Sequence, residues 1–184
     1  MSAPSSPRPA ATAVKIVVSG GFGVGKTTFV SAISEIEPLV TEAAMTDLSL
    51  GVDDAGDLLD KTTTTVALDF GRISLESTLL LYLFGTPGQD RFSFLWDDLV
   101  DGALGAVVLV DTRRVEDGFP AIDYFEERDI PFLVAINNFD NARRFEIAEV
   151  REALGFDDNI PVIECDARHR ESVKAVLVAL IRGL

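Results

Sequence analysis

A glycine-rich turn between an apolar strand-like run and a helical segment constrains the fold of this chain more than any other feature. The turn reads Gly-Gly-Phe-Gly-Val-Gly-Lys-Thr over residues 20–27 and follows the apolar run at residues 14–18. Glycines let the backbone curl so that several N–H groups point into one concave space, which attracts anions. The helix that follows would begin at this space and add the positive end of its dipole. The spacing therefore predicts a site for a phosphate group.

The positions of this turn have distinct predicted roles. Lys26 places a positive charge between two phosphates and supports catalysis, while the Thr27 hydroxyl is placed to bind Mg²⁺. Phe22 is expected beside the terminal phosphate of the ligand. Its bulky ring would hinder a catalytic arginine that another protein inserts into the site. The expected nucleotide contacts of this segment are Gly20, Phe22, Gly23, Val24, Gly25, Lys26, Thr27 and Thr28.

Apolar runs alternate with helical patterns along the rest of the chain. The runs occupy residues 14–18, 79–84, 106–110, 132–136 and 162–163, and they are continuous, which is typical of strands buried on both faces. The helical stripes are Phe29, Ile33 and Ile36 before Pro38; Ile147, Val150 and Leu154 before Gly155; and Val173, Val176, Leu177 and Leu180. This order predicts a three-layer α/β fold, with a mostly parallel central sheet and helices on both faces.

One long segment and the N-terminal residues stand outside this alternation. Residues 38–64 contain no clear periodic element and hold six acidic residues but a single basic one, Lys61. A loop of this length in a compact domain is usually functional or disordered. Residues 1–12 are rich in Pro, Ser and Ala and are expected to form a disordered tail, so a single domain is predicted over residues 13–184.

The charge balance excludes several classes of partner. The formal net charge is −14, so the surface repels nucleic acid and anionic lipid, and we expect neither as a direct partner. No apolar run approaches the ~20 residues that a membrane-spanning helix needs, and we recognise no lipidation signal. The lone Cys165 suits a reducing compartment. We therefore expect a cytoplasmic protein whose recruitment to a membrane, if any, depends on partners.

A second polar segment follows the apolar run at residues 132–136. It reads Asn137-Asn138-Phe139-Asp140 and resembles the Asn-Lys-x-Asp motif of the small GTPase superfamily. The Asp140 carboxylate can accept hydrogen bonds from N1–H and the 2-amino group of guanine. Adenine offers neither donor, and a site built for a donor can reject its absence by about 10⁴-fold or more. The resemblance therefore implies GTP or GDP, bound with Mg²⁺ in a P-loop NTPase fold, with contacts from Asn137, Asn138 and Asp140.

The base contacts implied by the resemblance continue after the next strand. Residues 165–168, Cys-Asp-Ala-Arg, look like the Ser-Ala-Lys loop of the superfamily, in which the Ala167 N–H would face the guanine O6. Position 138 departs from the family pattern, because Asn138 is too short to lay an aliphatic stem beside the base as lysine does. We expect Arg168 to cover part of the base instead, with Asp166 as a further contact.

Two more segments resemble the switch regions of the small GTPases. Residues 83–89, Leu-Phe-Gly-Thr-Pro-Gly-Gln, are similar to a segment containing Asp-Thr-Ala-Gly-Gln-Glu. By this resemblance Gly88 would offer its N–H to the γ-phosphate and Gln89 would orient the attacking water. Upstream, the run Lys-Thr-Thr-Thr-Thr-Val-Ala-Leu-Asp-Phe looks like the first switch as it enters a strand. Thr65 is the expected Mg²⁺-sensing threonine, and Thr64 is the alternative.

One departure concerns the metal. The aspartate with which these GTPases hold Mg²⁺ through water is replaced by Gly85. Weaker metal binding is expected unless another carboxylate helps, and Asp69 and Asp111 are the candidates. With its departures, the chain resembles the bacterial conservon GTP-binding proteins, relatives of the gliding-motility polarity GTPase, over about residues 13–182. That resemblance implies a molecular switch with a roadblock-type regulatory partner, often alongside a sensor-kinase-like membrane protein.

Three functions remain open on the sequence. The first is a GTPase switch with slow hydrolysis, because a catalytic arginine contributes about 10³–10⁵ in rate and residues 38–65 contain none. Arg91 lies in the second switch, but its position in the resembling family is usually structural. The second is a scaffold that binds guanine nucleotide without hydrolysing it, which Gly85 and Phe22 favour. The third is a P-loop ATPase or small kinase, against which Asp140 argues.

Overall fold

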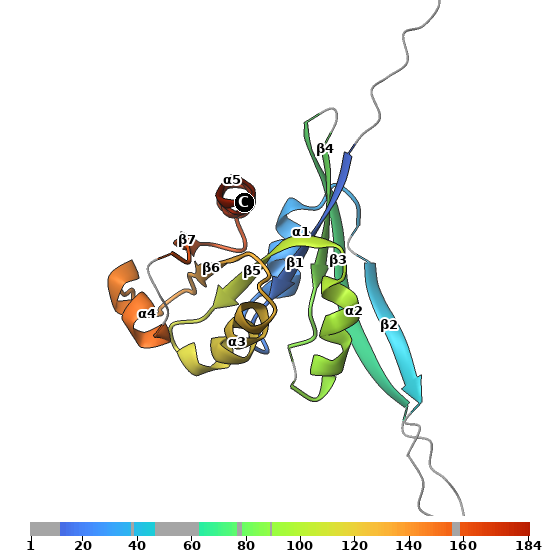
Figure 1. The fold of residues 1–184 in the computed structure, drawn as a ribbon, viewed down its shortest axis with the longest axis horizontal. Helices are drawn as coiled ribbons and strands as arrows, with labels where there is room; N and C mark the ends of the chain where they lie inside the picture. The colour runs from blue at the N-terminus through green and yellow to red at the C-terminus, as the bar shows by residue number, and fades with distance from the viewer. Residues whose placement is uncertain (1–11, 38, 47–62, 77–78, 89, 156–158) are drawn as a thin grey trace, which may run out of the picture.

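A seven-stranded sheet in the order β2-β3-β4-β1-β5-β6-β7 forms the centre of the computed structural model, and helices cover both of its faces (Figure 1). The predicted three-layer α/β fold with a mostly parallel sheet is therefore confirmed. The structure describes residues 12–37, 39–46, 63–76, 79–88, 90–155 and 159–184. The predicted tail over residues 1–12 lies outside these ranges except for Thr12, where β1 begins.

The strands run in one direction over most of the sheet. Their bounds are β1 Thr12–Ser19, β2 Leu39–Thr46, β3 Thr63–Glu76, β4 Leu79–Gly85, β5 Ala103–Val110, β6 Phe132–Asn137 and β7 Val162–Cys165. β1 pairs in parallel with β4 on one side and with β5 on the other, and β6 and β7 continue the parallel part. β3 is antiparallel to both of its neighbours, β2 and β4.

The helices divide between the two faces. Their bounds are α1 Lys26–Ile33, η1 Asp90–Leu95, α2 Trp96–Val100, η2 Val115–Gly118, α3 Phe119–Glu127, α4 Ile147–Leu154 and α5 Arg170–Gly183. The buried side chains of α1 and α5 form one core cluster, and those of α2, α3 and α4 form the other. Within the described ranges, every helix is too short or too polar to pass through a bilayer.

The central strands supply apolar side chains to both clusters. In β1, Ile16 and Val18 belong to the cluster of α1 and α5, whereas Val17 between them belongs to the cluster of α3 and α4. All three side chains are fully buried. Successive residues of a strand point to opposite faces, so a strand covered on both sides needs apolar residues at every position. This requirement explains the continuous apolar runs in the sequence.

The helical patterns of the C-terminal half are largely confirmed. α4 begins after Glu146, whose side chain forms a capping box with Glu149, and it ends at Gly155 with a φ of 70°. Two residues of its predicted stripe, Val150 and Leu154, are buried, but Ile147 in the first turn is exposed. The predicted stripe of α5 is buried at all of its positions, namely Val173, Val176, Leu177 and Leu180.

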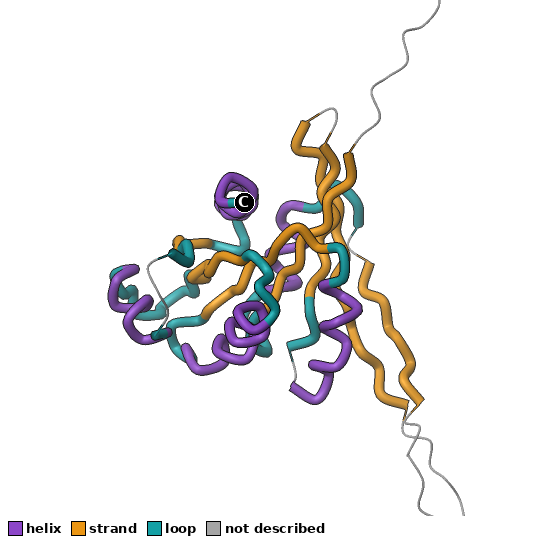
Figure 2. Tube along the Cα trace, viewed as in Figure 1, coloured by secondary structure: helices purple, strands orange, loops and turns teal. Residues whose placement is uncertain are grey.

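The segment without a periodic pattern contains a strand that the sequence did not reveal. β2 pairs antiparallel with β3, from Leu39 opposite Phe70 to Thr46 opposite Thr63. β2 lies at the outer edge of the sheet (Figure 2), and the structure describes only the backbone of residues 39–46 and 63–67. Hydrogen bonds to a long neighbouring strand define β2, and strand formation depends more on such context than on intrinsic preference.

The first helix is shorter than its apolar stripe predicts. α1 ends at Ile33, and Ser34 leaves the helical conformation with a ψ of 138°. The Ser34 hydroxyl donates to the carbonyl of Ile36 at 2.7 Å, and the Glu35 N–H donates to the Arg72 carbonyl in β3 at 2.7 Å. Bonds to the neighbouring strand therefore replace the last helical turn, and Ile36 lies outside the helix.

Candidate functional site

Loops after the parallel strands β1, β4, β6 and β7 meet at one edge of the sheet. Ligands of open α/β sheets bind outside this carboxyl edge of the strands. Two adjoining cavities lie there, a phosphate cavity of about 350 Å³ and a base cavity of about 290 Å³. Gly25 and Thr28 line both cavities, so a single elongated ligand can extend across them.

The phosphate turn, residues 20–27, curls as its glycine pattern predicts. Gly20, Gly23 and Gly25 have positive φ angles of 132°, 74° and 104°, which residues with a Cβ rarely adopt. A Cβ on Gly25 would also lie 2.6 Å from Asn137 Nδ2, so this turn packs closely against the end of β6. α1 begins at Lys26, directly after the turn, and its N-terminal residues line the phosphate cavity.

Lys26 is the buried cation of the phosphate cavity. Its Nζ donates to the carbonyls of Gly20 and Gly21 at 2.7 and 2.8 Å, and the residue is only 8% exposed. Burial lowers the pKa of Lys26 to about 8, while the nearby Asp69 carboxylate acts in the opposite direction. An ammonium group in this position gains from any anion that enters the cavity.

The segment after β4 packs directly on the phosphate turn. The Thr86 N–H donates to the Val18 carbonyl at 2.9 Å, and the hydroxyls of Thr86 and Ser19 are 2.9 Å apart. A Cβ on Gly88 would lie 2.6 Å from Lys26 Nζ, so Gly88 lies where the sequence predicts contact with a terminal phosphate. Gln89, the residue predicted to orient water, lies outside the described residues.

Of the two carboxylates offered as metal partners, only Asp69 lies in the phosphate cavity. The Thr27 hydroxyl donates to Asp69 Oδ2 at 2.8 Å. Asp111 is 3% exposed and bonded to the Arg113 guanidinium, with a shortest distance of 2.7 Å. Thr65, the predicted Mg²⁺-sensing residue, lies in β3 opposite Ala44, and Thr64 lies opposite Met45; their side chains are outside the described set.

Asn137 links the phosphate turn to the loop after β7. Its Nδ2 donates to the Val24 carbonyl at 2.8 Å, and its Oδ1 accepts from the Ala167 N–H at 3.0 Å. The Ala167 N–H, expected to face the guanine O6, thus has an amide partner in this structure. The Asn138 N–H donates to the Cys165 carbonyl at 2.7 Å, which ties the ends of β6 and β7 together.

An ion-pair cluster lies at the base cavity. Arg168 donates to Asp140 Oδ2 at 2.6 Å and to both oxygens of Asp166 at 2.8 and 2.9 Å. These hydrogen bonds from Arg168 hold the pKa values of the Asp140 and Asp166 carboxyls below their usual range. Arg168 lines the base cavity, as expected, but its guanidinium is bonded to the carboxylates of Asp140 and Asp166.

The sequence interpretation missed two arginines that follow β5. Arg113 lines the base cavity, with its guanidinium 4.0 Å from the centre of the Phe139 ring and bonded to Asp111. Arg114 Nη2 donates to the carbonyl of Phe22 in the phosphate turn at 3.0 Å. Their signal was their position, since both lie within four residues of the carboxyl end of β5, a buried parallel strand.

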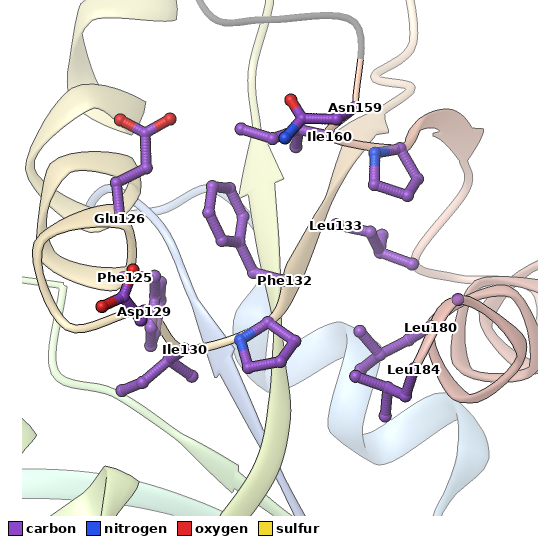
Figure 3. Close-up of a pocket in the computed structure, with 13 residues that line it drawn as sticks. Phe125, Glu126, Asp129, Ile130, Phe132, Leu133, Asn159, Ile160, Leu180 and Leu184 are labelled. Atoms are coloured by element: carbon purple, nitrogen blue, oxygen red, sulfur yellow. The ribbon is translucent and has the colours of Figure 1, made fainter.

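A larger cavity, of about 490 Å³, lies beside the starts of β6 and β7, at the edge of the sheet opposite the two smaller cavities. Figure 3 shows the side chains that line it. Phe132, at the start of β6, stands between the end of α3 and the end of α5, which contributes Leu180. The charged side chains that line this larger cavity are the carboxylates of Glu126 and Asp129, which repel phosphate. The chemistry of phosphate binding therefore favours the two smaller cavities.

We predict that Asn137→Ala destabilises the protein even without ligand. The change leaves the buried Val24 carbonyl and Ala167 N–H without their partner, and we expect the free energy of unfolding to fall by about 2–4 kcal/mol. Urea denaturation followed by circular dichroism measures this. Asn138→Ala is the matched control, because the hydrogen bond of Asn138 with the described residues comes from its backbone N–H, and its expected effect is within about 0.5 kcal/mol. Equal losses in both variants would contradict the linking role of Asn137.

Known proteins resemble this chain over most of its length. The profile of a family described as conserved hypothetical ATP binding protein matches residues 18–184. An uncharacterized protein of Methanocaldococcus jannaschii is 30% identical over 129 residues, which cover 69% of this chain and 71% of that protein. The Ras-related protein SEC4 of Candida albicans is 28% identical over 127 residues, which cover 64% of this chain and 60% of SEC4, less than two thirds of its length.

Solved structures share the fold at low sequence identity. The FeoB G-domain of Methanococcus jannaschii has a TM-score of 0.62 and 15% identity, covering 94% of this chain and 98% of that domain. The G domain of the T. maritima FeoB iron transporter has a TM-score of 0.64 and 17% identity, covering 94% of this chain and 99% of that domain. The family match extends from the end of β1 through α5 and includes every loop of the site. The chain therefore belongs to the family described as conserved hypothetical ATP binding protein.

Proposed function

We propose that this chain binds GTP and GDP together with Mg²⁺ and acts as a molecular switch that hydrolyses GTP slowly. The observation that carries the proposal is the pair of adjoining cavities, with the Lys26 ammonium in one and the Asp140 carboxylate beside the other. A chain of phosphates fits the first cavity and a purine base fits the second. In a molecule of net charge −14, the Lys26 ammonium and the N-terminal end of α1 supply the local positive potential that attracts a phosphate-bearing ligand.

The family description names ATP, whereas the base cavity of this chain favours guanine. Asp140 already accepts a hydrogen bond from Arg168 through Oδ2, and its pKa is lowered, so it is an ionised acceptor at neutral pH. Guanine brings two N–H donors that can replace or share this contact. Adenine brings no donor at the matching positions and would leave the carboxylate to Arg168 alone, so it gains nothing from Asp140.

The contacts around Lys26 support a switch. In the structure Lys26 bonds to the carbonyls of Gly20 and Gly21, and Gly88 lies so close that a Cβ there would approach Nζ to 2.6 Å. A terminal phosphate must enter this space, exchange those carbonyls for its own oxygens and meet the Gly88 N–H. The position of the segment after β4 therefore depends on whether the nucleotide has a γ-phosphate.

The oxygen groups beside Lys26 suit a magnesium ion. The Thr27 hydroxyl and the Asp69 carboxylate line the phosphate cavity, and Mg²⁺ binds oxygen ligands together with substrate phosphates. When bound, Mg²⁺ neutralises charge on the phosphates during transfer. Thr27 would hold it from α1, and the proposed role of Thr65 is to approach from β3 when the γ-phosphate is present.

The contacts of Arg114 support slow hydrolysis, and the side chain of Arg91, in the second switch, lies outside the described set. Arg114 reaches the phosphate turn, but it donates to the Phe22 carbonyl and pairs with Asp117 at 3.3 Å. The Phe22 side chain is 64% exposed at the same place, where it crowds the approach of an outside arginine. This arrangement also favours a second candidate, a scaffold that binds guanine nucleotide without hydrolysing it. Release of phosphate from bound GTP over hours distinguishes the two, because only the switch produces it.

The proposed partners are proteins. The conservon resemblance suggests a roadblock-type regulatory protein, with a sensor-kinase-like membrane protein reached through it, and a cytoplasmic location for this chain. Two aromatic side chains near the proposed nucleotide site are exposed. Phe22 lies in the phosphate turn, and Phe94 lies in η1, which follows the segment after β4; both offer apolar contacts to a partner. A partner that binds there would sense the nucleotide state directly.

We predict that Asp140→Asn removes the preference for guanine. Two hydrogen bonds to a charged acceptor are lost, so the affinity for GDP should fall by about 10²–10⁴-fold while the affinity for ADP stays unchanged. Calorimetric titration with GDP and ADP measures both. Asp123→Asn, at an exposed position of α3, is the matched control and should bind as the unmodified chain does. A chain that prefers ADP before any substitution would refute guanine specificity.

We predict that nucleotide affinity falls as pH rises above the pKa of Lys26. Below about pH 8 the free protein carries the charged ammonium that phosphate requires, and above it binding must take up a proton. Between pH 7 and 9 the affinity for GDP should first stay level and then decline toward about tenfold per pH unit. Fluorescence titration with a labelled GDP measures the profile.

The control for this prediction is Lys26→Ala. It should bind GDP much more weakly at pH 7 and should lose the decline above pH 8. An unchanged affinity in Lys26→Ala would show that the phosphate cavity has been assigned to the wrong residues.

A further inference from the structure

The carboxylate expected on the metal side of the phosphate cavity is absent at position 85. Gly85 ends β4 and directly precedes Thr86, which is anchored to β1. A metal ion beside phosphates and a single hydroxyl gains from an anionic oxygen on its protein side. The structure contains such an oxygen on another strand.

Asp69 fills the space that a side chain at position 85 would occupy. The two residues are partners in the antiparallel pairing of β3 with β4. A Cβ built on Gly85 would lie 2.8 Å from Asp69 Cβ and 2.9 Å from Asp69 Oδ2. Such short contacts mean that the chain has room for a carboxylate from one of the two positions and not from both. Glycine at 85 is therefore the condition that lets Asp69 reach the cavity.

The Asp69 carboxylate is already engaged with the residue predicted to bind the metal. The Thr27 hydroxyl donates its hydrogen to Asp69 Oδ2 at 2.8 Å. A hydroxyl oxygen keeps its lone pairs when it donates, so Thr27 remains able to bind a cation on its other side. Asp69 also lines the phosphate cavity together with Lys26, and its charge acts on the Lys26 ammonium.

We infer that Asp69, reaching across from β3, is the carboxylate partner of Mg²⁺ in this chain and replaces the side chain missing at Gly85. The inference rests on the proposed function, because it concerns the metal that accompanies the nucleotide. Asp111 does not compete for this role, since it is buried and neutralised by Arg113 outside the phosphate cavity. Among the described residues there is no cluster of three or more acidic, histidine or cysteine side chains, so Asp69 would act with Thr27 and the phosphates.

The first experiment measures how Mg²⁺ retains bound nucleotide. Release of a fluorescent GDP is followed over a range of free Mg²⁺ concentrations and with excess EDTA, for the unmodified chain and for Asp69→Asn. Loss of a metal-orienting partner costs about 10–100-fold in metal affinity, so the Mg²⁺ concentration for half-maximal retention should rise by that factor. Release in EDTA should be the same for both proteins, because no metal is present.

The second experiment moves the carboxylate to the other strand. Asp69→Gly removes the group together with its Cβ, and Gly85→Asp in the same chain supplies a carboxylate to the space thus opened. The double variant should recover most of the Mg²⁺ dependence that Asp69→Gly loses. Asp123→Asn on α3 is the charge-matched control and should retain GDP as the unmodified chain does. Thermal denaturation by circular dichroism confirms that each variant is folded.

The outcomes separate the inference from the proposed function. If the unmodified chain binds no labelled GDP in either condition, the proposed function fails. If it binds GDP with Mg²⁺-dependent retention that is equal in Asp69→Asn, the inference is wrong and the function stands. If Asp69→Asn accelerates release equally with Mg²⁺ and with EDTA, Asp69 only supports the shape of the cavity, and the inference is likewise overturned.

Discussion

A buried ammonium group held by two backbone carbonyls is the interaction on which the site depends. Lys26 is buried and its ammonium donates to the carbonyls of Gly20 and Gly21, while burial lowers its pKa to about 8. An isolated charge of this kind is costly, and it persists where the surrounding structure holds it in place. Here the first turn of α1 fixes the lysine and the glycine conformations fix the carbonyls. The cost becomes a gain when phosphate oxygens enter.

The sheet places this interaction at its carboxyl edge for reasons of packing. The middle strands are buried on both faces, so they can present polar groups only at their ends. Ser19 at the end of β1, Asp111 after β5 and Asn137 at the end of β6 are the buried polar residues that follow from this rule, and each is hydrogen-bonded. The phosphate turn, the segment after β4 that contains Gly88, and the loops after β6 and β7 lie next to one another at this edge.

The sequence predicted those parts of the site that depend on neighbours along the chain. The phosphate turn and the strand on each side of the base loops are local patterns, and the structure brings Lys26, Thr27 and Asp140 to the adjoining cavities. Asp69 could be named only as one of two candidates, because its role depends on the register between β3 and β4, which no local pattern encodes. The sequence did not predict β2 for the same reason, because its pairing with β3 defines this strand. Asn137 was expected as a base contact, but its part in joining two loops appears only when the folded chain brings Val24 and Ala167 beside it.

The described charged groups of the site have protein partners before any ligand arrives. Lys26 has two carbonyls, the Asp69 carboxylate has the Thr27 hydroxyl, and Asp140 has Arg168. A nucleotide therefore exchanges these contacts for its own and meets few groups that must first be stripped of water. Exchange keeps the cost of reorganisation low and preserves the geometry of the cavity. The contacts of Lys26 with the Gly20 and Gly21 carbonyls, and its closeness to Gly88, exist in the fold without a phosphate, and the proposed switch requires that these contacts form again when a phosphate leaves.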